Sequence, residues 1–301
     1  MTIRFRIAAL AAATASGVLL LTACSTTEIT PAQGNVGAAS DPDPGTGHLH
    51  GLGVDPADGT LYAAGHLGVF RLTPAGAVRI ADRYQDTMGF TITGPRTFLA
   101  SGHPSPTDPA ATSPHLGLIR STDTGHTWTT VSAAGEADFH SLQQAGPTLY
   151  GLDSQTSQIW ASTDAGATWE RRARISAGDL AAHAETPQEV WATSRDGLLH
   201  STDSGATFQP VPGTPALAAV ELPTPGQLIA LTTDGKVLSG GDGTSWKERG
   251  RLPGGVQGAV LTAAGPDHLL AADSNDAVHE SKDGGRTWTT VHQGGHTNTG
   301  H

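Results

Sequence analysis

Histidines and aspartates in the first half of this sequence have side chains that could bind a metal ion. Fourteen of the 301 residues are histidines. Imidazole nitrogens bind zinc, copper, iron or nickel, and neighbouring carboxylates complete such a site or orient the rings. The candidate metal ligands are His50, His66, His103 and His140. A wider candidate ligand-binding set adds His48, Met88 and Asp153 to these four.

The aspartates near these histidines offer a different chemistry. Glycoside hydrolysis needs two carboxyl groups roughly 5 to 10 Å apart across the scissile bond, and the catalytic candidates are Asp86, Asp138 and Asp153. Two further interpretations stay open: these side chains form hydrogen bonds between neighbouring structural units, or they line a pocket for a polar ligand or peptide. Spacing along the chain does not decide, because the residues meet only in the folded protein.

A repeated phrase indicates how the chain positions these residues. Five variants of the pattern Ser-x-Asp-x-Gly-x-Thr-Trp occur along the sequence. Their aspartates are Asp123, Asp164, Asp203, Asp242 and Asp283, and their aromatic positions hold Trp128, Trp169, Phe208, Trp246 and Trp288. A period of about forty residues indicates a series of similar supersecondary units. In each copy the aspartate can accept hydrogen bonds from its own turn, and the glycine tolerates a positive φ.

The pattern resembles the Asp-box, or BNR repeat, of sialidases, sortilin-type receptors and photosystem II assembly factors, which are β-propellers. The resemblance implies that each copy forms the hairpin between the third and fourth strands of a blade. We expect the aromatic ring to pack beneath its own hairpin. The third copy has Phe208 instead of tryptophan, and the fourth is one residue shorter between Asp242 and Trp246. These two hairpins should be held less firmly.

Short alternating runs between the copies predict the remaining strands. In the first unit, which lacks the repeated phrase, strands are predicted at His50–Val54, Thr60–Ala64 and Val69–Leu72. Similar runs recur in five later units. We therefore predict an all-β, six-bladed β-propeller of four-stranded antiparallel blades over residues 48–291. In propellers the first strand of each blade lines the channel, which would bring the candidate side chains to one rim.

The first 23 residues have the features of an export signal. Two arginines precede an apolar stretch, and residues 21–24 resemble a bacterial lipobox, whose cysteine receives a diacylglyceryl group. We expect a lipid anchor at Cys24, a flexible tether over residues 24–47 and a C-terminal tail over residues 292–301. An uncleaved signal anchor is the alternative. Both interpretations place the propeller on the extracytoplasmic face of the cell membrane.

The charge of the chain excludes one class of partner. The formal net charge is −11 at pH 7, and an acidic surface repels nucleic acid and anionic lipid headgroups. We therefore expect no nucleic-acid partner, and membrane contact through the lipid anchor only. Cys24 is the single cysteine, which excludes an intramolecular disulfide and a thiolate metal site.

The first half of the chain also resembles bacterial lipoproteins named glycosylhydrolases, a sialidase-like family. The similar runs include HLHGLGV from His48, DTMGF from Asp86 and ADFHSL from Ala137. The resemblance implies a glycosyl hydrolase activity. A sialidase, however, has an Arg-Ile-Pro motif, an arginine triad and a tyrosine nucleophile. This chain lacks Arg-Ile-Pro, and two of its tyrosines, Tyr62 and Tyr150, fall inside predicted strands, so the sialidase catalytic set is not found.

These features favour an extracytoplasmic lipoprotein whose propeller binds a ligand or partner through a central rim rich in histidine and aspartate. The expected partner is an envelope protein or a small polar or carbohydrate ligand. Two alternatives stay open. One is a carbohydrate-active enzyme that uses the aspartates, and the other is a propeller whose histidines bind a transition metal.

Overall fold

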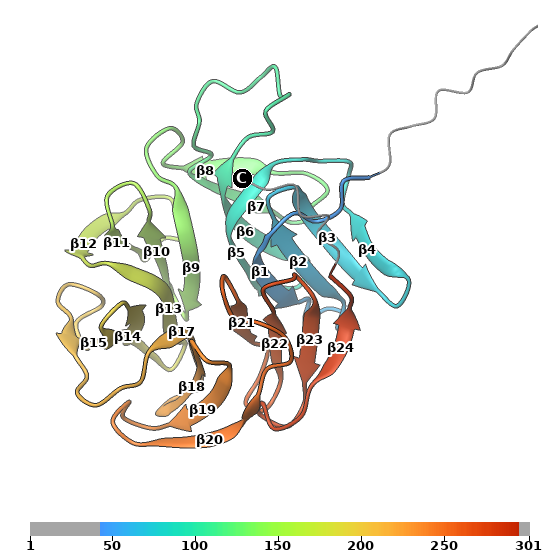
Figure 1. Ribbon diagram of the computed structural model, residues 1–301. Coiled ribbons are helices and arrows are strands. Elements are labelled where there is room, and N and C mark those ends of the chain that lie inside the picture. Colours follow the sequence, from blue (N-terminus) through green and yellow to red (C-terminus); the bar gives the residue numbers. More distant parts are fainter. Residues whose placement is uncertain (1–42, 295–301) are drawn as a thin grey trace, which may run out of the picture. The chain divides into compact units, whose positions relative to one another are not determined.

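The computed structural model describes residues 43–294 and shows six four-stranded antiparallel sheets arranged as the blades of a β-propeller (Figure 1). In every blade the four strands follow one another in the sequence and pair in that order. The prediction of an all-β, six-bladed propeller is confirmed. Within the described residues the elements are strands alone, so no helix there could cross a membrane.

Each blade is one continuous stretch of chain. Blade 1 contains β1 (Leu49–Val54), β2 (Leu61–Gly65), β3 (Gly68–Thr73) and β4 (Gly76–Arg79); blade 2 contains β5 (Asp86–Gly94), β6 (Thr97–His103), β7 (Leu118–Ser121) and β8 (Thr129–Ser132). Blade 3 contains β9 (Phe139–Ala145), β10 (Thr148–Asp153), β11 (Gln158–Ser162) and β12 (Glu170–Arg174); blade 4 contains β13 (Ala177–His183), β14 (Thr186–Ser194), β15 (Gly197–Ser201) and β16 (Gln209–Pro210). Blade 5 contains β17 (Leu217–Thr224), β18 (Gln227–Thr232), β19 (Lys236–Gly240) and β20 (Trp246–Arg251); blade 6 contains β21 (Val260–Ala263), β22 (Leu269–Ala272), β23 (Val278–Ser281) and β24 (Thr289–His292).

The second strand of each blade carries most of the core. β10 is buried at every position, whereas β8 and β16 have no buried residue. Successive side chains of a strand point to opposite faces. Leu149 of β10 accordingly packs in the apolar cluster shared with blade 2, and Tyr150 packs in the cluster shared with blade 4. The apolar runs that predicted the second strands are therefore the segments covered by both neighbouring blades.

Each repeated phrase forms the hairpin between the third and fourth strands of its blade. In blade 2, Asp123 Oδ1 accepts hydrogen bonds from the Ser121 hydroxyl at 2.8 Å and from the Thr127 N–H at 2.9 Å. The Gly125 N–H donates to Ser121 Oγ at 2.8 Å, and its φ of 87° explains the glycine. The same bonds recur around Asp164, Asp203 and Asp283.

The two atypical hairpins differ from one another. Around Asp203, whose phrase ends in Phe208, the hydrogen bonds are the same as in the regular copies. Asp242 instead accepts the Thr244 N–H at 2.9 Å and the Ser245 N–H at 3.4 Å. The different bonding of the fourth hairpin follows from its missing residue, which shortens the turn.

The aromatic ring of the phrase lies between two blades. Trp128 donates from Nε1 to a carbonyl of its own hairpin at 2.9 Å. Trp169, however, donates to Ser132 Oγ of blade 2 at 2.8 Å, and Phe208 packs against the cluster that contains Tyr150 of blade 3. The expectation that each ring packs beneath its own hairpin holds for Trp128, and for Phe208, whose ring lies beside Gly205 of the same hairpin. The structure adds a contact with the preceding blade that the sequence did not predict. The apolar cluster that receives the ring is shared with the preceding blade.

Blade 6 packs against blade 1 without exchanging a strand. Leu49 of β1 shares an apolar cluster with Leu270 and Val278. Asp276 precedes β23, and its Oδ1 accepts the Leu49 N–H at 2.7 Å and the Nδ1–H of His48 at 2.9 Å. Blade 1 has no phrase and therefore no hairpin aromatic. A carboxylate bonded to the start of β1 connects the blades at this junction.

The inner strands β1, β5, β9, β13, β17 and β21 surround the central axis, and β21 contacts β1. A Cβ at Gly89 of β5 would lie 2.4 Å from the Phe139 carbonyl oxygen of β9, so glycine permits this close approach of inner strands. Antiparallel pairing sets the start of each inner strand beside the end of the second strand, as Asp86 pairs with His103. Residues at the starts of the inner strands and at the ends of the second strands therefore meet on one rim.

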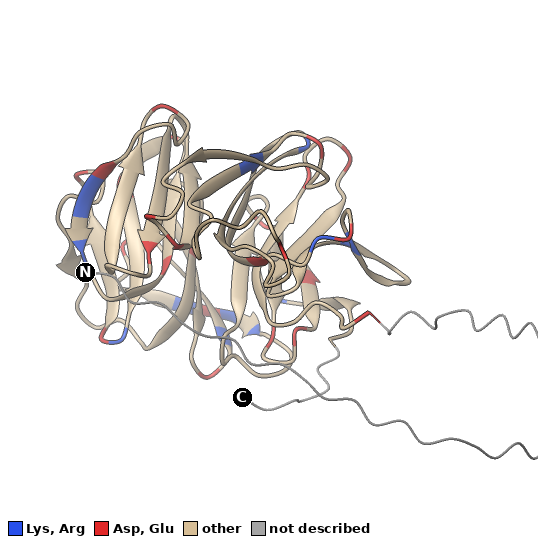
Figure 2. Cartoon of the chain, turned by 90° about the horizontal axis from the view of Figure 1, so that it is seen from above, with Lys and Arg blue, Asp and Glu red and all other residues tan. Residues whose placement is uncertain are grey.

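Charged side chains of the propeller are mixed in sign. Over the described residues, Figure 2 shows basic segments that are few and interspersed with acidic ones. Nucleic-acid binding requires basic residues gathered on one face. The absence of a nucleic-acid partner stays a prediction from the net charge.

The structure shows order at both ends of the predicted propeller. Residues 43–47, assigned to the flexible tether, contact blade 1, because Arg79 binds the Asp43 carboxylate and the Gly45 carbonyl. His292, assigned to the C-terminal tail, is the last residue of β24. The predicted signal, Cys24, residues 25–42 and residues 295–301 lie outside the described residues.

Replacing Asp276 by alanine should weaken the closure of the ring. The buried Leu49 N–H would lose its acceptor, and an unsatisfied buried donor costs about 1–3 kcal/mol. We expect the free energy of unfolding, measured by urea denaturation, to fall by that amount. Asp196, exposed in the turn between β14 and β15, is the matched control, and its replacement by alanine should cost less than about 0.5 kcal/mol. Equal effects of the two substitutions would contradict this role of Asp276.

Candidate functional site

The predicted residues of the first three blades come together at one end of the channel. In chain order they are His48, His50, His66, Asp86, Met88, His103, Asp138 and His140. All lie at or next to the start of an inner strand, or at or next to the end of the second strand that pairs with it. We call these residues the His/Asp rim.

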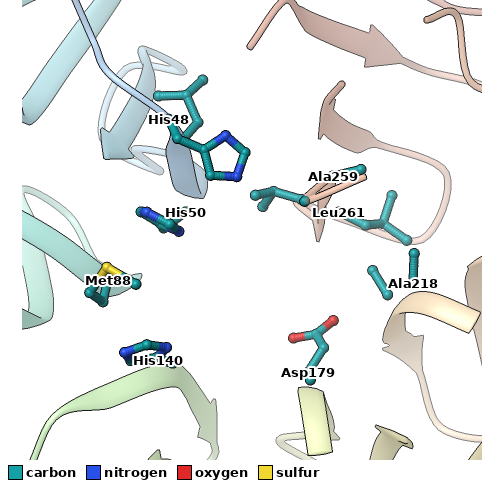
Figure 3. A pocket seen from close by; sticks show the side chains of 13 residues that line it. His48, His50, Met88, His140, Asp179, Ala218, Ala259 and Leu261 are labelled. Carbon is teal, nitrogen blue, oxygen red and sulfur yellow. The ribbon is translucent and has the colours of Figure 1, made fainter. Parts of the chain in front are cut away.

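A pocket of about 350 Å³ opens between this rim and the inner strands of blades 4 to 6 (Figure 3). One wall contains the rim residues His48, His50, Met88 and His140. The facing wall contains Ala218, Ala259 and Leu261, with Asp179 beside them. A wall of imidazoles opposite a wall of small apolar side chains suits a small ligand with one polar end.

Asp179 of β13 and Glu221 of β17 are acidic groups of the channel that the candidate set did not include. The Val220 N–H donates to Asp179 Oδ2 at 3.1 Å. Burial raises the pKa of Asp179 to about 6. Burial, with repulsion from Asp179, raises the pKa of Glu221 well above its usual range. Both carboxyl groups line the channel together with His50 and His140. Both residues lie on inner strands, and this position could have indicated from the sequence that they face the channel.

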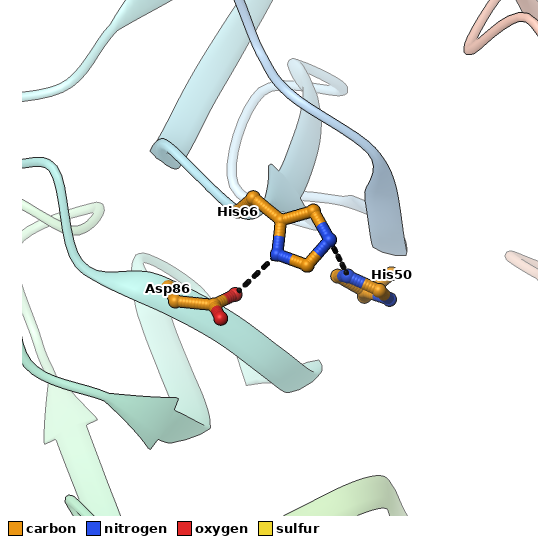
Figure 4. A group of neighbouring side chains, drawn as sticks. All are labelled: His50, His66 and Asp86. Atoms are coloured by element: carbon orange, nitrogen blue, oxygen red, sulfur yellow. Dashed lines mark hydrogen bonds and ion pairs between the residues drawn. The ribbon is translucent and has the colours of Figure 1, made fainter. Parts of the chain in front are cut away.

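Three imidazole rings of blade 1 lie against one another. The ring centroid of His50 is 5.0 Å from that of His48 and 4.6 Å from that of His66. His50 Nε2 lies 3.3 Å from His66 Nε2, and His66 Nδ1 lies 3.0 Å from Asp86 Oδ1 (Figure 4). His66 thus presents one ring nitrogen to His50 and the other to a carboxylate.

The distance between the two Nε2 atoms suits a shared metal ion. Two nitrogens at about 2.0–2.1 Å from a tetrahedral ion are separated by roughly 3.3–3.4 Å, and the observed distance is 3.3 Å. Metal-binding imidazoles commonly donate their other ring N–H to a carboxylate, which is the relation of His66 to Asp86. A ligand atom of Asp86 also lies within 4.8 Å of ligand atoms of His50 and His66.

A chain of alternating carboxylates and imidazoles continues from Asp86 into blade 3. Asp86 Oδ2 lies 3.2 Å from His103 Nδ1. His103 Nε2 lies 3.4 Å from Asp138 Oδ2, and His140 Nε2 lies 3.0 Å from the same oxygen. Each carboxylate therefore stands between two imidazoles. This alternation orients the rings and places a negatively charged carboxylate beside each imidazole of the row.

Burial and hydrogen bonding separate the pKa values within the rim. Burial, followed by repulsion from the neighbouring imidazoles, lowers the pKa of His50 to about 4. The hydrogen bond to Asp86 raises the pKa of His66 and outweighs the opposing effect of burial. Burial opposes ionisation of Asp138, but hydrogen bonds from imidazole and hydroxyl donors hold its pKa at about 2. At neutral pH His50 is therefore uncharged, and Asp138 is a carboxylate.

Asp153 does not belong to this rim. Its side chain is fully buried, Oδ1 accepts the Asp138 N–H at 3.0 Å, and Oδ2 accepts the Thr156 N–H at 3.1 Å. The carboxylate holds the turn after β10 and does not line the pocket. We therefore correct its prediction as a ligand-binding and catalytic residue. An aspartate at the end of a second strand serves here as a turn residue.

His115 joins the site although no sequence pattern pointed to it. It lies in the connection between β6 and β7, and a ligand atom of His115 lies within 4.8 Å of ligand atoms of His103 and Asp138. This connection spans residues 104–117, whereas the corresponding connections of the other blades are much shorter. A residue in an insertion has no counterpart in the repeat, so the period gives no information about its position.

Comparison with known proteins shows the fold alone. No family model matches the sequence, and no curated protein matches it. A GH74 xyloglucanase from Xanthomonas campestris is 17% identical with a TM-score of 0.53, and the match covers 82% of this chain and 45% of the enzyme. YCF48 bound to D1 peptide is 15% identical with a TM-score of 0.51, over 84% of this chain and 87% of YCF48. A chain of the nidogen/laminin complex is 13% identical with a TM-score of 0.56, over 73% of this chain and 88% of that chain.

These similarities support a propeller architecture and no closer relation. The chain spans less than half of the length of the GH74 enzyme. The resemblance of the repeated phrase to the Asp-box, and of the first half to sialidase-like lipoproteins, stays a prediction from the sequence.

We expect His50 of the metal-free protein to stay neutral in mildly acidic solution. Its ring should titrate near pH 4 rather than 6.5, because burial and neighbouring imidazoles disfavour its proton, whereas His66 should titrate above 6.5. The unfolded chain takes up this proton near 6.5, so His50 contributes a loss of stability as the pH falls from 6.5 to 4. NMR titration of the ring Cε1–H signals measures both values. Titration of the two rings together near pH 6.5 would disprove the assignment.

Proposed function

We propose that this protein is an extracytoplasmic, lipid-anchored β-propeller whose His/Asp rim binds a transition-metal ion. The observation that carries the proposal is the pair of Nε2 atoms of His50 and His66, which face each other at 3.3 Å beside the pocket. Asp86 bonds the other nitrogen of His66 and orients its ring. Imidazole and carboxylate donors suit zinc and the neighbouring divalent transition metals.

The position of this pair favours an exchangeable ion over a purely structural one. His50 lines the pocket, and the side chain of His66 is 46% exposed. A site with few protein ligands on an open face keeps coordination positions for water or for a second ligand. The proposed ion is therefore accessible from the extracytoplasmic solution.

The location of the protein is the second part of the proposal. Residues 21–24 have the order of a lipobox, and the apolar stretch before them is shorter than a membrane span requires. Diacylation of Cys24 would supply two acyl chains, which suffice for stable anchoring. The residues that follow would tether the propeller to the membrane surface.

The pocket favours a second candidate function, the binding of a small polar or carbohydrate ligand or of a peptide from an envelope protein. Its apolar wall lies opposite the imidazoles, so a ligand there would contact His50 and His140 and could fill an open position of the ion. Propellers of similar fold include YCF48 bound to D1 peptide and a GH74 xyloglucanase, so the fold is compatible with both ligand classes.

Glycoside hydrolysis by the rim aspartates is less favoured. A glycosidase needs one carboxyl group whose raised pKa keeps it protonated as the general acid. Burial opposes ionisation of Asp86, but its hydrogen bonds to His66 and His103 lower its pKa, and the pKa of Asp138 is lowered to about 2. The two rim carboxylates therefore suit the orientation of imidazoles better than acid catalysis.

Replacing His50 by asparagine should weaken Zn²⁺ binding more than tenfold, because one of two facing nitrogens is lost. Isothermal titration of metal-free protein with Zn²⁺ measures the effect. Replacing Asp86 by asparagine should lower the Zn²⁺ affinity by about 10- to 100-fold, because the ring of His66 loses the carboxylate that orients it. His268→Asn is the matched control, because His268 pairs with Glu280 at 2.8 Å outside the rim. The proposal is abandoned if the wild-type protein binds no Zn²⁺, Cu²⁺ or Ni²⁺ at micromolar concentration.

Replacing Cys24 by serine should release the protein from the membrane, because serine offers no thiol for the acyl chains. Fractionation of cells that express the full chain measures the distribution, with detergent-phase partitioning as a second readout. The wild type should remain in the membrane fraction, and Thr22→Ser should leave this unchanged. Membrane retention of Cys24→Ser would contradict anchoring through this cysteine.

A further inference from the structure

We propose that His103, His115 and Asp138 form a second metal site, separate from the pair of His50 and His66. One ligand atom from each of the three residues lies within 4.8 Å of the other two. His103 ends β6, His115 lies in the connection to β7, and Asp138 immediately precedes β9. The second site does not require that the first one binds an ion.

Two buried polar atoms that lack a hydrogen-bond partner indicate a cation at this place. Asp138 is 1% exposed, and its Oδ1 has no hydrogen-bond partner among the described residues. The Nδ1 atom of His115 is likewise buried without a partner in the described part of the chain. Buried polar groups are almost always paired, and an unpaired buried carboxylate oxygen is especially unfavourable. A cation held between Asp138 and His115 would give these buried groups a partner.

The distances within the group fit coordination better than a hydrogen bond. His103 Nε2 lies 3.4 Å from Asp138 Oδ2. A nitrogen and an oxygen on a tetrahedral zinc ion are separated by roughly 3.3–3.5 Å, whereas charge-assisted hydrogen bonds between such groups are about 2.7–2.9 Å long. The ring of His115 stands 5.5 Å from that of His103 at an interplanar angle of 50°. Two imidazoles and a carboxylate are thus gathered around one volume.

Surrounding residues already hold two of these side chains in place. Asp86 Oδ2 lies 3.2 Å from His103 Nδ1, which leaves Nε2 directed at Asp138. The Ser154 hydroxyl donates to Asp138 Oδ2 at 2.8 Å. Carboxylate and hydroxyl partners of this kind fix the orientation of metal ligands and raise affinity. Two nitrogens and an oxygen are a donor set for zinc or a similar divalent transition metal.

Asp86 connects the two sites. Its Oδ1 lies 3.0 Å from His66 and its Oδ2 lies 3.2 Å from His103. One carboxylate therefore orients an imidazole of each site. Loss of Asp86 should weaken both ions, whereas loss of His115 should affect the second ion alone.

Metal content of variants tests the second site. Metal-free full-length protein is equilibrated with buffered free Zn²⁺ at micromolar concentration, and bound zinc per chain is measured by mass spectrometry of the elements. We expect two equivalents in the wild type and in the His268→Asn control, and one in His115→Asn. We expect one equivalent in His50→Asn and none in the variant that carries both His50→Asn and His115→Asn. Circular dichroism and the unfolding midpoint of each metal-free variant show that it is folded.

The possible outcomes separate this inference from the proposed function. If His50→Asn retains an equivalent that His115→Asn lacks, the second site is established even if the first proves too weak to measure. If the wild type binds one equivalent that depends on His50 and not on His115, the second site is rejected and the proposed function stands. Visible absorption of the Co²⁺-loaded protein gives an independent readout. A tetrahedral spectrum that Asp138→Asn does not alter would also reject the site.

Discussion

The structure depends on burial of the second strands between neighbouring blades. Each blade is only one sheet thick, and its second strand has apolar side chains on both faces. A single sheet cannot cover both of these faces, so each blade needs a neighbour on either side. Closing the ring satisfies this requirement for all six blades, because blade 6 covers the remaining face of blade 1. The rim exists as a consequence, since closure directs the starts of the inner strands to one axis.

Contacts between blades follow one scheme at five junctions and another at the sixth. Where a repeated phrase is present, its aromatic ring packs against an apolar cluster shared with the preceding blade. Blade 1 lacks the phrase, and Asp276 instead accepts hydrogen bonds from His48 and from the Leu49 backbone. The carboxylate that closes the ring therefore also fixes an imidazole of the rim. Asp276 therefore links the stability of the closed propeller to the orientation of His48 in the rim.

The His/Asp rim gathers polar groups on three adjacent blades, whereas the other half of the pocket is lined mainly by apolar side chains, with Asp179 beside them. Carboxylates alternate with imidazoles from His66 to His140, so each ring has an anionic neighbour. The facing wall offers small side chains such as Ala218 and Ala259. This asymmetry gives the pocket a metal-binding side and a side that can contact the apolar part of a ligand. Both proposed functions use this one arrangement.

The sequence by itself determined the architecture and most of the rim residues, because both depend on periodicity. Repeated aspartates and glycines fixed the hairpins locally, and alternation placed His50, Asp86 and His140 at strand ends. The tertiary structure alone decided which of these side chains touch. It removed Asp153, whose oxygens hold a turn, and it added His115 and Asp276, which lie in irregular segments. Distances between blades depend on how the closed ring packs, and no spacing along one chain records them.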